Sequence, residues 1–270
     1  MPATRSRPSD IVLDLLRGAR SRGQSARSLV AAGQLFGLTD NTVRVTLSRL
    51  MARGLIESPA RGTYRLTERT DALNAFVERW RLGEARVRPW RSGEWLFAHV
   101  QGELAGSLWA LDAMGFREVR GGLYARPDNL AVGIDALRAI GAGIGLAPGV
   151  LLIAGRPDGE PMPAAWLRAW HPAALDDGYV DMLQRLRDSA AKLERLPADD
   201  ARLQSFRLGG EAIHLLAKDP LLPADVVDAG ARAALWREMT QYEALGKSIW
   251  AGAFDSTIRA MPIPQLATSH

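Results

Sequence analysis

The stretch from Thr39 to Leu50, TDNTVRVTLSRL, carries side chains suited to reading DNA bases. In a helix, at about 100° per residue, its small polar residues and its two arginines gather on one face. A helix in the DNA major groove needs such a face, because amide and guanidinium groups hydrogen-bond base edges and the methyl groups of Thr or Val contact thymine. The predicted base-reading residues are Asn41, Thr42, Arg44, Val45, Ser48 and Arg49.

Three helices are predicted to hold this face in place. The first starts at Pro8-Ser9-Asp10, and the second starts at Ser25 and ends at Gly37, where a glycine enters the left-handed cap at low cost. The third runs from about Asp40 to Arg53. The residues of the third helix that we expect to pack on the first two are Val43, Leu47, Leu50 and Met51.

An alternating apolar and polar pattern follows the third helix. The segments LIES and TYRLT are typical of two strands, and PARG between them is typical of a turn. Arg61 falls at the predicted tip and Arg65 on the second strand, where we expect both to hold DNA phosphate. Three helices followed by a basic hairpin are the order of a winged helix. The alternative interpretation is a surface helix beside an unrelated hairpin.

The charge distribution agrees with a polyanionic partner for the front of the chain. Residues 1–69 contain twelve arginines and five acidic residues, a net charge of +7, which leaves −3 for the rest of a chain whose total is +4. A basic front on a mildly acidic body favours contact with nucleic acid. Basic residues that only keep the surface solvated would give the same net charge. The charge therefore supports the DNA-binding interpretation but does not establish it alone.

The remaining residues indicate an α+β fold in three parts. After a winged helix with its following helix over 1–82, the order strand, helix, strand, helix, strand between EWLFAHV and GVLLIAG predicts a central ferredoxin-like α/β sandwich over 83–172. Helical patterns fill the rest and predict a helical C-terminal domain over 173–270. Eight tryptophans, all behind the winged helix, are expected in cores, in a dimer interface or at the wall of an apolar pocket.

Four stretches together resemble the PaaX-type transcriptional repressors of phenylacetate catabolism. They are DNTVRVTLSRLMARGLI, WALDAMGFREVRGGLYARP, AWHPAALDDGYVDMLQRL and IHLLAKDPLLPADVV, in the order of that family. The resemblance implies a winged helix, a ferredoxin-like domain akin to the small nuclease-like subunit of CRISPR adaptation, and a helical C-terminal domain. It also implies a homodimer that leaves double-stranded operator DNA when an aryl- or acyl-CoA thioester binds. A basic pair typical of the family is reduced to Ala217-Lys218, so the effector is expected to differ from phenylacetyl-CoA.

The predicted effector-binding residues flank a Gly-Gly turn. Arg117, Arg120 and Arg126 surround Gly121-Gly122 and are candidates for contact with the phosphates of coenzyme A. A solvated basic hairpin or a second DNA contact explains the same three arginines. No other cofactor is expected.

Enzymatic motifs were sought, and we expect no catalytic or metal site. The segment GAGIGLAPG has Leu146 where a dinucleotide-binding loop needs its third glycine, and four scattered histidines lack ligand spacing. The alternative function is a metal-dependent nucleic-acid hydrolase built on the central sandwich. Such an enzyme needs at least two convergent acids, and the first central strand is followed by Glu103 alone.

The amino-acid composition also indicates the cellular compartment in which we expect the protein. Cysteine is absent, which excludes disulfides and thiolate metal sites and is typical of a reducing cytoplasm. No run of eighteen apolar residues predicts a membrane span, and the first residues lack the apolar stretch of a secretory signal. We expect a cytoplasmic regulator that is not an enzyme.

Overall fold

The computed structural model describes residues 7–19, 23–100, 104–157 and 164–251. It divides into two compact units. Unit 1 contains residues 1–74, 193–206 and 244–270, and unit 2 contains residues 75–192 and 207–243. Each unit contains segments from different parts of the chain, so this division does not test the predicted domain boundaries at residues 82 and 172.

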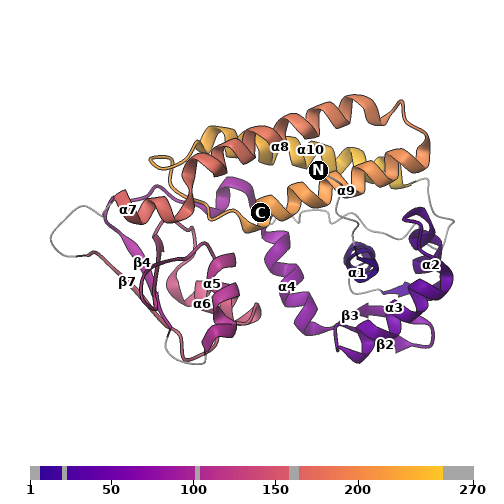
Figure 1. Cartoon of the computed structure of the whole chain (residues 1–270), viewed down its shortest axis with the longest axis horizontal. Helices are drawn as coiled ribbons and strands as arrows, with labels where there is room; N and C mark the ends of the chain where they lie inside the picture. The colour runs from indigo at the N-terminus through magenta and orange to yellow at the C-terminus, as the bar shows by residue number, and fades with distance from the viewer. Residues whose placement is uncertain (1–6, 20–22, 101–103, 158–163, 252–270) are drawn as a thin grey trace, which may run out of the picture. The chain divides into compact units, whose positions relative to one another are not determined.

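The front of unit 1 is a three-helix winged helix (Figure 1). Its helices are α1 (Pro8–Ala19), α2 (Ala26–Leu35) and α3 (Asp40–Ala52). Its strands are β1 (Gln24–Ser25), β2 (Ile56–Ala60) and β3 (Thr63–Leu66), which form an antiparallel sheet in the order β1-β3-β2. The hydroxyl groups of Ser25 and Thr39 accept the backbone N–H groups of Ser28 and Thr42, so each caps the helix that follows it.

The core of the winged helix lies between α1, α2, α3 and the hairpin. On α3, Val43, Leu47 and Leu50 are buried as predicted. The prediction for Met51 was wrong, because its side chain is 41% exposed, and Thr46 is buried instead. Residues 43, 46, 47 and 50 form the buried stripe, and Met51 lies beyond it in the last turn of α3, which ends at Ala52. The Thr46 hydroxyl donates to the Thr42 carbonyl at 2.7 Å, so no polar group is lost.

A glycine sets the approach of α2 to α3. A methyl group added at Gly33 would lie 2.7 Å from Cγ2 of Val43, closer than real side-chain contacts allow. The two helices pack at this distance because Gly33 has no side chain there. Elsewhere in unit 1, the ring of Phe36 meets that of Phe206 edge-on at 4.8 Å and lies near that of Trp250 at 6.3 Å.

Unit 2 contains a four-stranded antiparallel sheet in the order β5-β6-β4-β7. Its strands are β4 (Trp95–His99), β5 (Arg117–Arg120), β6 (Leu123–Pro127) and β7 (Leu151–Gly155). The helices α5 (Leu108–Ala113) and α6 (Ile134–Gly143) follow β4 and β6 along the chain and lie on one side of the sheet (Figure 1). This β-α-β-β-α-β order confirms the predicted ferredoxin-like sandwich and the α+β fold.

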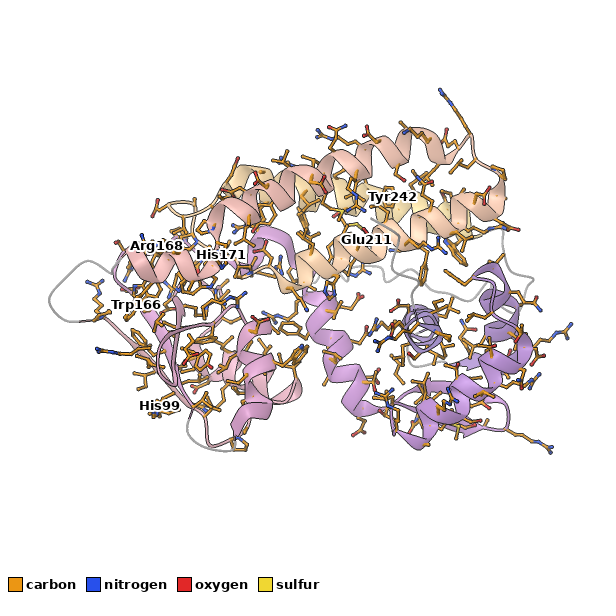
Figure 2. All side chains as sticks on the ribbon, in the orientation of Figure 1. His99, Trp166, Arg168, His171, Glu211 and Tyr242 are labelled. Carbon is orange, nitrogen blue, oxygen red and sulfur yellow. The ribbon has the colours of Figure 1, made fainter. Side chains whose placement is uncertain are left out.

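Tryptophans cover the other face of this sheet. Trp95 and Phe97 on β4 contact Trp166, which lies in the short helix α7 (Ala164–Leu167) and is labelled in Figure 2. Trp170, in the 3-10 turn η4 (Arg168–Trp170), packs on Trp95 and donates its indole N–H to the Gly115 carbonyl at 2.8 Å. These aromatic rings are core residues, as expected for most of the eight tryptophans.

The rest of the described chain is helical. A short helix α4 (Glu68–Glu78) and two 3-10 segments, η2 (Arg79–Arg86) and η3 (Leu104–Ser107), precede α5. Three long helices form the predicted helical C-terminal region, α8 (Pro172–Leu193), α9 (Ala198–Lys218) and α10 (Ala229–Ala251). Within the described ranges, no helix combines the length and the apolar character needed to cross a membrane.

Candidate nucleic-acid interface

The predicted base-reading residues share one surface of α3. Asn41, Arg44, Ser48 and Arg49 are exposed, Val45 is 39% exposed and Thr42 is half-buried. Thr39 ends the preceding turn and caps α3, so the first of these side chains follows the start of the helix directly. The buried stripe that ends at Leu50 fixes the opposite side of α3 on its neighbours.

These side chains differ in how many hydrogen bonds and ion pairs they form within the protein. Arg44 forms an ion pair with Asp40 one turn earlier, and the Ser48 hydroxyl donates to the Arg44 carbonyl at 3.1 Å. The Thr42 hydroxyl lies 2.9 Å from that of Thr39. Asn41 and Arg49 have no side-chain partner among the described residues. They are therefore the two groups whose hydrogen-bonding capacity is wholly available to a ligand.

The hairpin presents its two arginines differently. Arg61 is exposed in the turn between β2 and β3, beside Gly62, whose φ of 76° lies in the left-handed region. Arg65 on β3 is paired with Glu57 on the neighbouring strand at 2.5 Å. The sequence analysis predicted neither ion pair, although the i,i+4 spacing of Asp40 and Arg44 on a helix is a known signal for the first of them.

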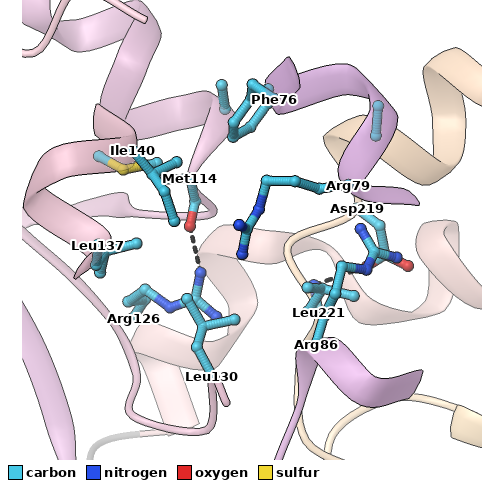
Figure 3. A pocket seen from close by; sticks show the side chains of 12 residues that line it. Phe76, Arg79, Arg86, Met114, Arg126, Leu130, Leu137, Ile140, Asp219 and Leu221 are labelled. Carbon is cyan, nitrogen blue, oxygen red and sulfur yellow. Dashed lines mark hydrogen bonds between the residues drawn. The ribbon is translucent and has the colours of Figure 1, made fainter. Parts of the chain in front are cut away.

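The three arginines proposed for an effector are not gathered in one cavity. Arg117 is paired with Asp112 at 2.9 Å, and Arg120 is exposed. Arg126 is 2% exposed and points to the opposite side of β6 from its neighbour Ala125, which pairs with Arg117. Arg126 lines a cavity of unit 2 that Arg79 and Arg86 also line (Figure 3). Sequence reasoning missed Arg79 and Arg86, because they follow α4 in a segment without a motif.

No described group of three or more His, Cys, Asp or Glu side chains could hold a metal ion. Glu103, the acid considered for a nuclease, lies outside the described residues. His99 at the end of β4 and His171 after η4, both labelled in Figure 2, come from separate elements.

Comparison with known proteins agrees with the winged-helix geometry. Residues 8–70 match the family of PaaX-like proteins. The match runs from α1 into the first residues of α4, and it confirms the predicted resemblance over the part of the chain that carries Asn41, Arg49 and Arg61. The other three stretches behind that resemblance lie outside the matched residues.

One solved structure is similar in fold over most of the chain. The uncharacterized protein Rv0674 from Mycobacterium tuberculosis is 24% identical, with a TM-score of 0.55, over 91% of this chain and 99% of that one. At this identity the likeness concerns the fold. A search of the curated proteins finds none that matches.

Proposed function

We propose that this PaaX-like chain is a transcriptional regulator that binds double-stranded operator DNA through α3 and the β2–β3 hairpin. The observation that carries the proposal is the exposed face of α3, where Asn41 and Arg49 project without a partner among the described residues. Asn pairs well with adenine and Arg with guanine in the major groove. Arg61, at the hairpin turn, supplies a phosphate contact that holds the protein in register.

Fluorescence anisotropy tests the proposal. Labelled DNA from the region upstream of the chain's own gene should bind more tightly than random DNA of the same length, at one fixed salt concentration. Equal binding of the two DNAs would leave only nonspecific affinity. Absence of binding even at low salt would refute the proposal.

We also propose that the regulator acts as a homodimer. A single winged helix offers few contacts, and a two-fold protein binds half-sites about 10 bp apart or a multiple of that spacing. The edge strand β7 supports pairing through unit 2, because Leu151 and Ile153 are 53% and 46% exposed on it. A monomer in light scattering, with a single asymmetric footprint on DNA, would contradict this part.

The finer proposal is cytoplasmic repression relieved by an aryl- or acyl-CoA thioester. A ligand shifts an equilibrium only through its different affinities for the two states, and moving a dimer from nearly all operator-competent to nearly all incompetent takes about 5 kcal/mol. A thioester offers phosphates, adenine and an apolar tail for such a preference. Calorimetry of thioesters with and without operator is the test. Operator affinity that no bound thioester changes would remove the effector and keep the DNA binding.

The rival function, a metal-dependent nucleic-acid hydrolase, has a direct assay. DNA or RNA is incubated with the protein and Mg²⁺ or Mn²⁺. We expect no cleavage above background, and cleavage that a chelator abolishes would favour the rival.

A further inference from the structure

An arginine cluster of unit 2 lines one cavity. Its members are Arg79 and Arg86, the first and last residues of η2, and Arg126 on β6 (Figure 3). The remaining lining is mostly apolar and includes Phe76, Met114, Leu130, Leu137, Ile140 and Leu221. Three cations inside a mostly apolar cavity are costly unless negative charge accompanies them.

Two of the three arginines are held by backbone carbonyl groups. Arg126 donates to the carbonyls of Met114 and, at 3.1 Å, of Pro220, and Arg86 donates to the Leu216 carbonyl at 3.2 Å. Burial lowers the pKa of Arg126 to about 10, and it also lowers the pKa of Arg86. Carbonyl groups satisfy the N–H donors and orient both guanidinium groups, but they do not neutralise the charge.

Arg79 is the member of the cluster whose guanidinium group has no hydrogen-bond acceptor among the described residues. Its side chain is half-buried and extends towards the cavity beside Met114 and Arg126 in Figure 3. Among the described residues, none accepts a hydrogen bond from its guanidinium group, and burial lowers its pKa. A planar group with two parallel N–H donors fits a carboxylate.

One acid faces the three cations. Asp219 accepts the Tyr179 hydroxyl at 3.0 Å and the Leu221 N–H at 2.7 Å through Oδ1, and burial raises the pKa of its carboxyl group. Its other oxygen, Oδ2, is buried without a partner in the described part of the chain. With one acid against three cations, the lining keeps a net charge of +2 when all four are ionised. A monoanion such as a carboxylate lowers this net charge to +1.

The size of the cavity limits which chemical group of a ligand it can enclose. The cavity has a volume of about 40 Å³, and one water molecule needs roughly 10–15 Å³ of such volume. That space suits about three heavy atoms, the number in a carboxylate. The carboxylate fills this space, so the hydrocarbon tail of a longer acid lies beyond it, beside the apolar side chains of the lining.

We infer that this cavity binds the carboxylate of a short-chain organic acid, with Arg79 as the principal ligand and Arg126 and Arg86 as fixed positive charges. This inference goes beyond DNA binding and does not depend on it, because binding is measured on the full chain without DNA. Failure of operator binding would leave it intact.

Calorimetry with butyrate tests the inference, with the neutral isostere butyramide and inorganic phosphate as matched probes. Butyrate should bind at least about tenfold more tightly than either, a difference of about 1.4 kcal/mol. Arg79→Gln should weaken butyrate binding by at least about tenfold. The control is Arg168→Gln, an exposed arginine on η4 that is labelled in Figure 2 and is not among the residues that line the cavity.

Each outcome decides between the possibilities. Equal affinity for butyrate and butyramide, or equal affinity of the wild type and Arg79→Gln for butyrate, overturns the inference, as does absence of butyrate binding. Phosphate that binds as well as butyrate and competes with it would show a general anion site and overturn the carboxylate assignment. The comparison of butyrate with butyramide needs no variant, so it holds even if Arg79→Gln fails to fold.

Discussion

The exposed arginines of the winged helix and the arginine cluster of unit 2 place the same kind of side chain in opposite environments. Arg49 and Arg61 are exposed and have no side-chain partner among the described residues, whereas Arg126 is buried and held by carbonyl groups. An exposed guanidinium group remains hydrated and can exchange water for phosphate at little cost. A buried one has already lost its water, so it contributes to the fold through its hydrogen bonds and can attract an anion only at short range. Burial, and not residue type, therefore separates the two roles.

Removing the buried member should have the largest effect. Arg126→Met leaves the carbonyls of Met114 and Pro220 without their donor in a closed environment. We expect the free energy of unfolding to fall by about 3–5 kcal/mol, measured by urea denaturation. Arg168→Met at an exposed position should change it by less than about 0.5 kcal/mol. A loss of under about 1 kcal/mol for Arg126→Met would mean that water or another side chain replaces its bonds.

Substitutions on the exposed surface of α3 should change the specificity of DNA binding and leave the stability of the fold unchanged. Asn41→Ala or Arg49→Ala should cost about 1–3 kcal/mol of affinity for a specific operator and less for random DNA. Neither variant should change the midpoint of unfolding much, because neither side chain is buried. Paired anisotropy titrations on the two DNAs measure the difference. Equal losses on both would show that Asn41 does not read a base.

The hairpin arginine should act on all DNA alike. Arg61→Ala removes one exposed charge at the β2–β3 turn. We expect weaker binding to specific and random DNA by the same factor, and a plot of log affinity against log salt whose slope falls by about 1. A salt series for wild type and variant gives this slope. A loss confined to the specific operator would move Arg61 from the phosphate contacts to the base contacts.

The smallest effect is expected from an arginine that is already paired. Glu57→Gln frees Arg65, which is paired with Glu57 on the hairpin, both side chains being partly exposed. Because exposed ion pairs contribute about 0–1 kcal/mol, stability should hardly change, while affinity for random DNA at low salt should rise slightly. Unchanged or lower affinity would place Arg65 away from the phosphates.

Local signals in the sequence predicted most of the winged helix. The helix start at Ser25, the glycine after α2 and the alternating hairpin pattern each follow from chemistry within a few residues. Met51 was misplaced because the extent of the core depends on how many turns of α3 its neighbours cover, which helical spacing does not contain.

The cavity of unit 2 could not be predicted in the same way. Arg79 and Asp219 are 140 positions apart in the numbering and meet only in the folded unit. The segment DPLLP gave a recognisable motif, but its role depends on distant donors, since Arg126 donates to Pro220 and Asn129 to Leu221. Hydrogen bonds between such distant residues depend on how the elements pack. A single sequence has no periodic pattern that would predict them.

The close contact at Gly33 has a consequence for how operator preference can change over evolutionary time. Because Gly33 lets α2 and α3 approach closely, a larger residue there would push against Val43 and change how α3 packs, while every exposed side chain of α3 stays the same. If α3 binds DNA as proposed, a buried position can therefore change the preferred DNA sequence, and a comparison confined to the exposed residues would count the two proteins as equivalent.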